Sequence, residues 1–161
     1  MGKYVNYLIQ PVTILSVKHE DKFNFCTAAW ISTVSMKPPL VMAAIHLNRF
    51  THDLVIHSDD FCINILADDQ VELSELAGTI SGRNRDKSKI KAFKFEESTI
   101  VKSPQIKDCA AFYECRKVGF TLAGDHTLFT GEILNSGIDE SKNPLLRYRS
   151  KYYKIGEIAG K

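Results

Sequence analysis

Short apolar runs rich in β-branched and aromatic residues recur along the chain, and this pattern is typical of β-strands. Turn residues separate the runs, without a Pro/Ser-rich linker or a repeat of solenoid period. The predicted strands are Val12–Val17, Phe25–Ser35, Leu40–Ile45, Phe61–Leu66, Phe95–Val101, Ala110–Cys115, Gly119–Leu122, Thr127–Leu134 and Tyr148–Ile155. So many strands favour a mainly β barrel. With 161 residues, of which 44% are hydrophobic, we expect a single domain over residues 1–161.

Two short helices are expected between the strands. The clearer one begins near Asp69, which forms a capping-box-like pair with Glu72. Its apolar residues recur at i, i+3, i+4 and i+7, namely Leu73, Leu76, Ala77 and Ile80. The shorter helix starts at Thr51, whose hydroxyl is suited to cap the following turn. Its N-terminus therefore lies two residues after Arg49.

Charge and hydropathy argue against several classes of partner. The chain has 21 basic and 19 acidic residues, and a formal net charge of +2 gives no electrostatic case for nucleic acid or an anionic membrane. No apolar run approaches the length of a bilayer span, and the N-terminus lacks the apolar core of a signal peptide. We therefore expect a cytoplasmic protein whose partners must be inferred from its sites.

Sequence motifs for metal binding and for nucleophilic catalysis are missing. The four cysteines do not have the spacing of zinc or iron–sulfur ligands, and the histidines show no HExxH pattern. We interpret Cys109 and Cys115 as a reduced structural pair, with a redox role as the alternative. Since GxSxG, P-loop and GxGxxG motifs are also missing, the hydrolase, NTPase and Rossmann interpretations lose their main support.

The stretch NFCTAAWISTVSMKPPLVMAAI, from Asn24 to Ile45, combines small residues with hydroxyl side chains. A flat ring ligand can lie against a backbone only where side chains such as Ala28 and Ala29 leave room. The hydroxyls in this stretch, those of Thr27, Ser32, Thr33 and Ser35, would then supply polar contacts. The same pattern also fits an ordinary buried strand, and these residues alone leave both interpretations open.

Four segments together resemble the flavin reductase-like family. They are FNFCTAAWISTVSMKPPL, RFTHDLV, SGRNRDK and GFTLAGDHTLFTGEI, in the order in which the family has them and spread over nearly the whole chain. The last one contains a tight hairpin turn at Gly124-Asp125. The resemblance implies an FMN-binding split barrel with one or two short helices, noncovalent FMN, NAD(P)H as a transient substrate, and a homodimer.

Phosphate binding is predicted near residue 49. A helix N-terminus offers unpaired amides and the positive end of a dipole, so Arg49 and Thr51 form a candidate cradle for the FMN phosphate, although Thr51 could be a cap only. The resemblance also assigns Ser81 and Lys87 to the cofactor. Their charged stretch, taken alone, is typical of a solvated surface.

Ring contacts and one catalytic residue follow from the resemblance. It implies cofactor contacts from Thr27, Ala28, Ala29, Trp30 and Ser32. It also places His126 near the flavin edge, where it could position a nicotinamide or tune the reduced flavin. The alternatives are a Trp30 that belongs to the core and a His126 that bonds to the backbone of its turn.

The expected activity is NAD(P)H-dependent reduction of bound FMN, with electrons passed to free flavin or to a redox protein. Hydride moves directly to the flavin, so the missing acid–base constellation is compatible with this chemistry. The first alternative is a flavoredoxin-like electron carrier or flavin-binding module that does not oxidise nicotinamide. The second is a barrel of this fold that binds haem, another flavin-like ligand or nothing, because fold does not fix function.

Overall fold

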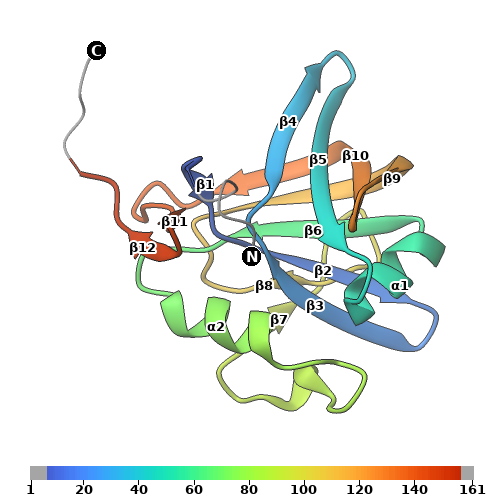
Figure 1. The fold of residues 1–161 in the computed structure, drawn as a ribbon, viewed down its shortest axis with the longest axis horizontal. Helices are drawn as coiled ribbons and strands as arrows, with labels where there is room; N and C mark the ends of the chain where they lie inside the picture. The colour runs from blue at the N-terminus through green and yellow to red at the C-terminus, as the bar shows by residue number, and fades with distance from the viewer. Residues whose placement is uncertain (1–6, 157–161) are drawn as a thin grey trace.

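The fold is built on one antiparallel sheet that curls into a barrel (Figure 1), and the computed structural model describes residues 7–156. The strands of this sheet are β2 (Thr13–His19), β3 (Lys22–Ala28), β4 (Ile31–Met36), β5 (Pro39–His46), β6 (Asp60–Ile65), β9 (Ala111–Ala123) and β10 (His126–Ile138). They lie in the order β3-β2-β6-β9-β10-β5-β4. The predicted mainly β split barrel with short helices is confirmed.

The barrel closes where the chain crosses from one edge of the sheet to the other. The two edge strands, β3 and β4, are consecutive in sequence and are separated only by Ala29 and Trp30. The Trp30 carbonyl accepts a hydrogen bond from the Ala44 amide of β5 (2.9 Å). The prediction of one strand over Phe25–Ser35 is therefore wrong, because the run must break to change edges.

Two apolar cores cover the two faces of β2 and β3. Inside the barrel, Leu15 of β2 packs with Phe61 and Phe129. Outside it, the neighbouring Ile14 packs with Phe93 and with residues of a helix beside the sheet. Because successive side chains of a strand point to opposite faces, both faces of β2 are buried, and its run of apolar residues needs no polar alternation.

The first helix, α1 (Phe50–His57), starts one residue earlier than predicted. Arg49 is the N-cap residue and has an extended backbone, and no side chain caps the first turn. The predicted cap by Thr51 is wrong because its hydroxyl is fully buried and accepts a hydrogen bond from Nδ2 of Asn24 (2.8 Å). Thr51 thus ties α1 to β3 instead of completing the helix end.

The second helix, α2 (Val71–Thr79), packs along the outer face of β3 (Figure 1). Its N-cap residue is Gln70, whose side chain accepts a hydrogen bond from the Ala67 amide (2.9 Å) and makes no cap. The predicted start near Asp69 is two residues early, and the capping box with Glu72 does not form. The prediction that one face of this helix packs on the barrel is confirmed by Ala77, which is fully buried in the outer core.

The predicted strands between residues 95 and 122 also differ from the structure. The runs Ala110–Cys115 and Gly119–Leu122 belong to one long strand, β9, whose register with β10 shifts at Thr130/Gly131. Of the run Phe95–Val101, only β7 (Phe95–Glu96) is a strand, paired with β8 (Gln105–Ile106), because backbone amides in the segment that follows bond to buried carboxylates rather than to a neighbouring strand.

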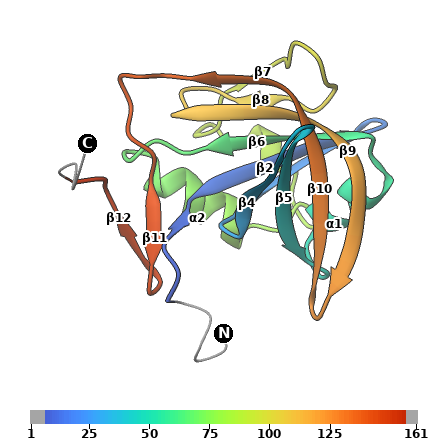
Figure 2. The same ribbon diagram turned by 90° about the horizontal axis from the view of Figure 1, so that it is seen from above.

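The last predicted strand, Tyr148–Ile155, is a small hairpin. β11 (Leu146–Tyr148) and β12 (Lys151–Tyr153) pair through a turn in which Arg149 and Ser150 have φ of 48° and 65°. β11 also pairs with β1 (Gln10–Pro11). This three-stranded sheet lies beside the barrel on the side of α2, as Figure 2 shows.

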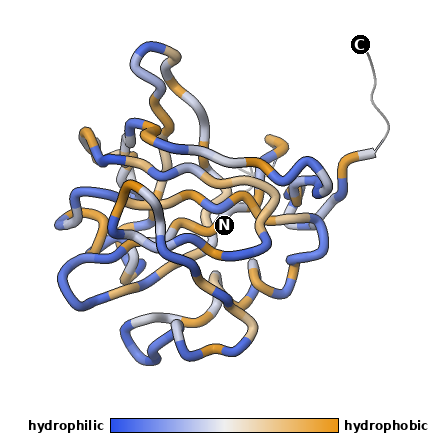
Figure 3. Tube along the Cα trace, turned by 180° about the vertical axis from the view of Figure 1, so that it is seen from behind, coloured by the Kyte–Doolittle hydropathy of each residue, from blue (hydrophilic) through white to orange (hydrophobic). Residues whose placement is uncertain are grey.

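The predicted hairpin turn at Gly124-Asp125 joins β9 to β10, and Gly124 has a φ of 62° that favours glycine. Along the chain, hydrophilic residues gather in the peripheral loops (Figure 3). Within residues 7–156, no helix is both long enough and apolar enough to cross a membrane.

Candidate flavin-binding cavity

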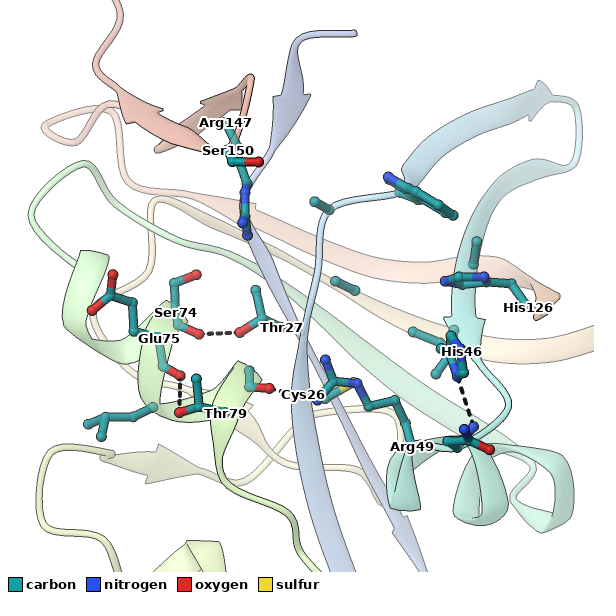
Figure 4. Close-up of a pocket in the computed structure, with 18 of the residues that line it drawn as sticks. Cys26, Thr27, His46, Arg49, Ser74, Glu75, Thr79, His126, Arg147 and Ser150 are labelled. Atoms are coloured by element: carbon teal, nitrogen blue, oxygen red, sulfur yellow. Dashed lines mark hydrogen bonds between the residues drawn. The ribbon is translucent and has the colours of Figure 1, made fainter. Parts of the chain in front are cut away.

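An open cavity of about 1250 Å³ lies between the end of β3, the α1 end of the barrel and the exposed side of α2 (Figure 4). Its lining comes from five places in the sequence. The residues are Cys26–Trp30, Ala44–His46, Asn48, Arg49, Glu72, Ser74–Leu76, Gly78, Thr79, Asp125, His126, Arg147, Ser150 and Tyr152. Segments far apart in the sequence therefore meet here, at the point where the barrel closes.

One wall of the cavity is the strand end with the smallest side chains. Ala28 and Ala29 line the cavity together with Thr27, whose hydroxyl donates a hydrogen bond to the Ser74 carbonyl of α2. The Cα of Gly78 also faces Thr27, and a Cβ there would lie 3.3 Å from its hydroxyl oxygen. The short side chains and the close approach of α2 leave a backbone surface on which a flat ligand can lie.

A cation stands at the N-terminus of α1, next to this wall. Arg49 lines the cavity and donates from Nη1 to the Gly78 carbonyl at the end of α2 (2.6 Å). Within residues 7–156, its guanidinium makes no other hydrogen bond and no ion pair. Its remaining N–H groups, together with the dipole at the start of α1, suit an anionic group such as a phosphate.

Aromatic and imidazole rings form the opposite edge. The ring centroid of His126 lies 4.5 Å from that of Trp30 and 5.0 Å from that of His46. Nδ1 of His126 lies 2.6 Å from Oδ1 of Asp125, so this nitrogen carries a proton and donates it to the carboxylate. The hydrogen bond from His126 lowers the pKa of Asp125. Nε2 of His126 takes no part in that bond.

Six of the ten predicted site residues line the cavity, and four do not. The six are Thr27, Ala28, Ala29, Trp30, Arg49 and His126. Ser32 lies on β4 beyond the crossing, is exposed, and donates to the Thr33 carbonyl. The hydroxyl of Ser81 accepts from the Arg83 amide in the exposed loop after α2. Neither hydroxyl is brought to the cavity.

Thr51 and Lys87 lie behind the cavity wall. Lys87 is 3% exposed and donates from Nζ to the Phe25 carbonyl (2.5 Å) and the Ala77 carbonyl (2.8 Å). Burial lowers the pKa of this ammonium group to about 8. Lys87 thus links β3 to α2, and Thr51 links β3 to α1 through Asn24. Both hold the wall in place without facing the cavity.

Sequence reasoning missed residues that reach the cavity through long-range pairing. His46 ends β5 and lies directly opposite His126 in the β5–β10 register. Pairing the two predicted strands would have found it. For Arg147 and Tyr152 of the C-terminal hairpin, the sequence carries no such signal, because nothing local indicates where this hairpin docks.

Cysteines and metal ligands do not add chemistry to the site. All four cysteines are free thiols. Cys26 lines the cavity, and burial raises its pKa. Burial also raises the pKa of Cys109, to about 12, so its thiol is a poor nucleophile. In the part of the chain that the structure describes, no three His, Cys, Asp or Glu residues are grouped to hold a metal ion.

The fold is that of a small flavin-binding barrel. The family model of the flavin reductase like domain matches residues 5–156, and the chain belongs to this family. The resemblance found in the sequence is confirmed.

Individual relatives agree with this assignment. The chain is 37% identical over 131 residues to an uncharacterised protein of Archaeoglobus fulgidus, covering 81% of this chain and 74% of that protein. It is 31% identical over 149 residues to the NADH:riboflavin 5'-phosphate oxidoreductase of Streptomyces pristinaespiralis, covering 91% and 81%. The crystal structure of flavoredoxin from Methanosarcina acetivorans superposes with a TM-score of 0.90 at 25% identity, covering 100% and 92% of the two chains.

Proposed function

We propose that this protein binds FMN in the cavity and oxidises NAD(P)H, passing electrons through the flavin to free flavin or to a protein acceptor. The observation that carries the proposal is the cavity itself, in which a small-residue strand end, the Arg49 cation and the His126 edge meet in a chain of the flavin reductase family. The relative from Streptomyces pristinaespiralis is named as an enzyme with this type of activity.

The lining fits the phosphate and the ring of FMN. Arg49 and the amides at the start of α1 suit the phosphate, the backbone around Ala28 and Ala29 suits a flat ring, and Trp30 suits the ring edge. Charge-assisted hydrogen bonds contribute about 1.5–3 kcal/mol each, whereas micromolar affinity needs roughly 8 kcal/mol. Contact with the ring must therefore supply much of the affinity, which is why the small residues matter.

Bound FMN would supply the hydride-accepting centre, and the chain's own residues would orient the donor and exclude water. The rings of Trp30 and His126 lie in contact at one edge of the cavity, tilted by 34° to each other, where they limit how a nicotinamide ring can approach. Asp125 keeps a proton on Nδ1 of His126, so Nε2 is free to bond a substrate group. No general base is required, because the hydrogen leaves the nicotinamide together with both electrons of its bond and no proton has to be removed from the donor.

A homodimer in the cytoplasm is part of the proposal. Apolar side chains are exposed on two strands. On β9, Val118, Phe120 and Leu122 are 49%, 54% and 66% exposed, and on β4, Met36 is 86% exposed. Exposed apolar patches commonly mark interfaces. The four free thiols suit a reducing compartment. Light scattering of the purified protein measures the oligomeric state directly, and a monomer would contradict this part.

The test of the proposed reaction is an anaerobic mixing experiment. FMN-loaded protein is mixed with NADH or with NADPH, and the flavin absorbance near its visible maximum is followed. We expect bleaching with at least one of the two donors. The variant Arg49→Met should weaken FMN binding about 10-fold or more, whereas Arg83→Met, which removes an exposed arginine paired with Asp53, should not. If neither donor bleaches the flavin, the enzyme proposal fails.

The likeness to flavoredoxin favours one second candidate, an electron carrier that takes electrons from a protein. Reduced ferredoxin in place of NAD(P)H separates the two. A carrier would be bleached by reduced ferredoxin and by neither nicotinamide, whereas a reductase is bleached by a nicotinamide.

A further inference from the structure

The cavity has a second guanidinium group at the end away from α1. Arg147 and Ser150 line it from the C-terminal hairpin, and Figure 4 shows them apart from Arg49, with Thr27 between the two arginines. Among the described residues that line the cavity, Arg49 and Arg147 are the only arginines or lysines. The predicted FMN phosphate accounts for Arg49 and leaves Arg147 without a role.

The hairpin presents Arg147 in a fixed orientation. Arg147 and Tyr152 are directly opposite each other in the β11–β12 register, so their side chains share one face of the hairpin. The guanidinium carbon lies 5.6 Å from the centre of the Tyr152 ring, and the Tyr152 hydroxyl lies 3.1 Å from Oγ of Ser74 on α2. The arginine thus rests on a ring that is itself bonded to the cavity wall.

The hairpin is in turn joined to the barrel. Leu145, which precedes β11, donates to the Leu66 carbonyl (2.8 Å) and accepts from the Val12 amide (2.9 Å). The turn brings Ser150 to the cavity with a positive φ of 65°, a conformation that serine adopts rarely. A platform held in this way positions a cation more firmly than a free side chain on the surface.

The guanidinium of Arg147 has no charged or hydrogen-bonding partner among the described residues. Within residues 7–156, its guanidinium makes no ion pair and no hydrogen bond, although Glu72 and Glu75 of α2 line the same cavity. A planar guanidinium fork with free N–H groups suits the oxygens of a phosphate. The hydroxyls of Ser150 and Tyr152 can add neutral hydrogen bonds to the same group.

We propose that Arg147, Ser150 and Tyr152 form a second phosphate subsite, which binds the diphosphate of the nicotinamide dinucleotide while Arg49 holds the phosphate of FMN. This inference rests on the proposed function for the identity of the second ligand. The cavity volume of about 1250 Å³ exceeds the roughly 300–1,000 Å³ of an ordinary small-molecule site, and a site for two ligands explains the excess.

The test measures binding without turnover. ADP-ribose, which carries the dinucleotide's diphosphate and no nicotinamide, is titrated into FMN-loaded protein by calorimetry. Arg147→Met should weaken ADP-ribose binding about 10-fold or more while the FMN dissociation constant, from fluorescence quenching, stays within about 3-fold. In turnover, the KM for the nicotinamide should rise by a similar factor with kcat nearly unchanged. Arg147→Lys, which keeps the charge, should recover part of the affinity.

The matched control is Lys151→Met, which removes one positive charge from the same hairpin at an exposed position outside the cavity. It should leave ADP-ribose binding unchanged. Thermal melting of each variant checks that the hairpin change has not unfolded the protein, and loss of ADP-ribose binding to the wild type with rising salt provides a test without substitution.

Several results would overturn the subsite. One is ADP-ribose binding that is equal in wild type and Arg147→Met, or absent from the wild type. Weaker FMN binding by Arg147→Met would mean that Arg147 contacts the flavin phosphate. A selective loss of affinity for FAD would mean that it contacts the adenylate of that cofactor. Failure of NADH and NADPH to bleach the flavin would instead end the proposed function, whether or not ADP-ribose binds.

Discussion

Glu114 and Asp125 are both carboxylates that accept hydrogen bonds from neighbouring groups. They differ in whether the group they bind keeps a nitrogen available for a ligand. Glu114 is fully buried, and every partner is internal. It accepts hydrogen bonds from the amides of Thr99, Ile100 and Val101 and from the side chains of Gln105 and Asn135. Asp125 has 75% of its side chain exposed, and it bonds one nitrogen of His126 while the other stays available. A polar group whose hydrogen bonds are all made inside the protein stabilises the fold, whereas one with a free donor or acceptor can bind a ligand.

The same contrast separates the cations around the cavity. Lys87 is buried, and its ammonium group donates hydrogen bonds to two carbonyls. Arg49 donates one hydrogen bond, to the Gly78 carbonyl, and its other guanidinium N–H groups have no partner within residues 7–156. Buried polar groups are costly when unpaired, and Lys87 is paired with the carbonyls of Phe25 and Ala77. Arg49 stays at the surface of the cavity, where water or a ligand can pair it.

The largest expected effect on stability is that of Glu114→Ala. It leaves three backbone amides and two side-chain amides without their acceptor, and each unpaired buried donor costs about 1–3 kcal/mol. The free energy of unfolding in urea should fall by at least about 3 kcal/mol. Glu132→Ala, which removes an exposed ion pair with Arg116, should change it by less than about 1 kcal/mol. Equal losses in the two variants would show that the buried carboxylate has no special role.

A smaller effect, about 3 kcal/mol at most, is expected from the titration of Lys87. Burial lowers its pKa to about 8 in the folded protein, whereas it is about 10.4 in an unfolded chain. Between these values the unfolded state binds more protons, so the contribution of Lys87 to stability rises with pH. In urea unfolding from pH 7 to 10, the free energy of unfolding of the wild type should rise relative to that of Lys87→Met. Parallel curves would mean that this ammonium group titrates normally.

Local patterns made the fold predictable, while long-range contacts decided the site. Apolar runs located the segments that form the main sheet, although one run covered both β3 and β4 and two runs covered β9, and the Gly124-Asp125 turn fixed the β9–β10 hairpin. The break at Ala29 and Trp30 could not be seen, because the run remains strand-like there and only barrel closure interrupts it. Lys87 was assigned to the cofactor because the segment SGRNRDK resembles one in the family, and its charged stretch alone was typical of a solvated surface. Its burial depends on Phe25 and Ala77, 62 and 10 residues away.

His126→Asn should separate chemistry from folding. Removing the ring takes away its contact with Trp30 and the nitrogen proposed to bond a substrate group, so NAD(P)H-dependent bleaching of bound FMN should slow about 10-fold. The FMN dissociation constant and the thermal melting temperature should stay close to wild type, because His126 lies at the cavity edge. The control is His57→Asn, at an exposed histidine outside the cavity. A stability loss without a rate loss would place His126 with Glu114 among the structural groups.

The smallest expected effect tests whether one chain holds the whole site. Thr27→Val removes a hydroxyl that lines the cavity and bonds to Ser74, and FMN binding should weaken several-fold, as the loss of one neutral hydrogen bond predicts. Ser32→Ala removes an exposed hydroxyl on β4, outside the cavity, and FMN binding should not change. Fluorescence titration with FMN measures both. A loss in Ser32→Ala equal to that in Thr27→Val would mean that β4 completes the cavity of a second copy of this chain.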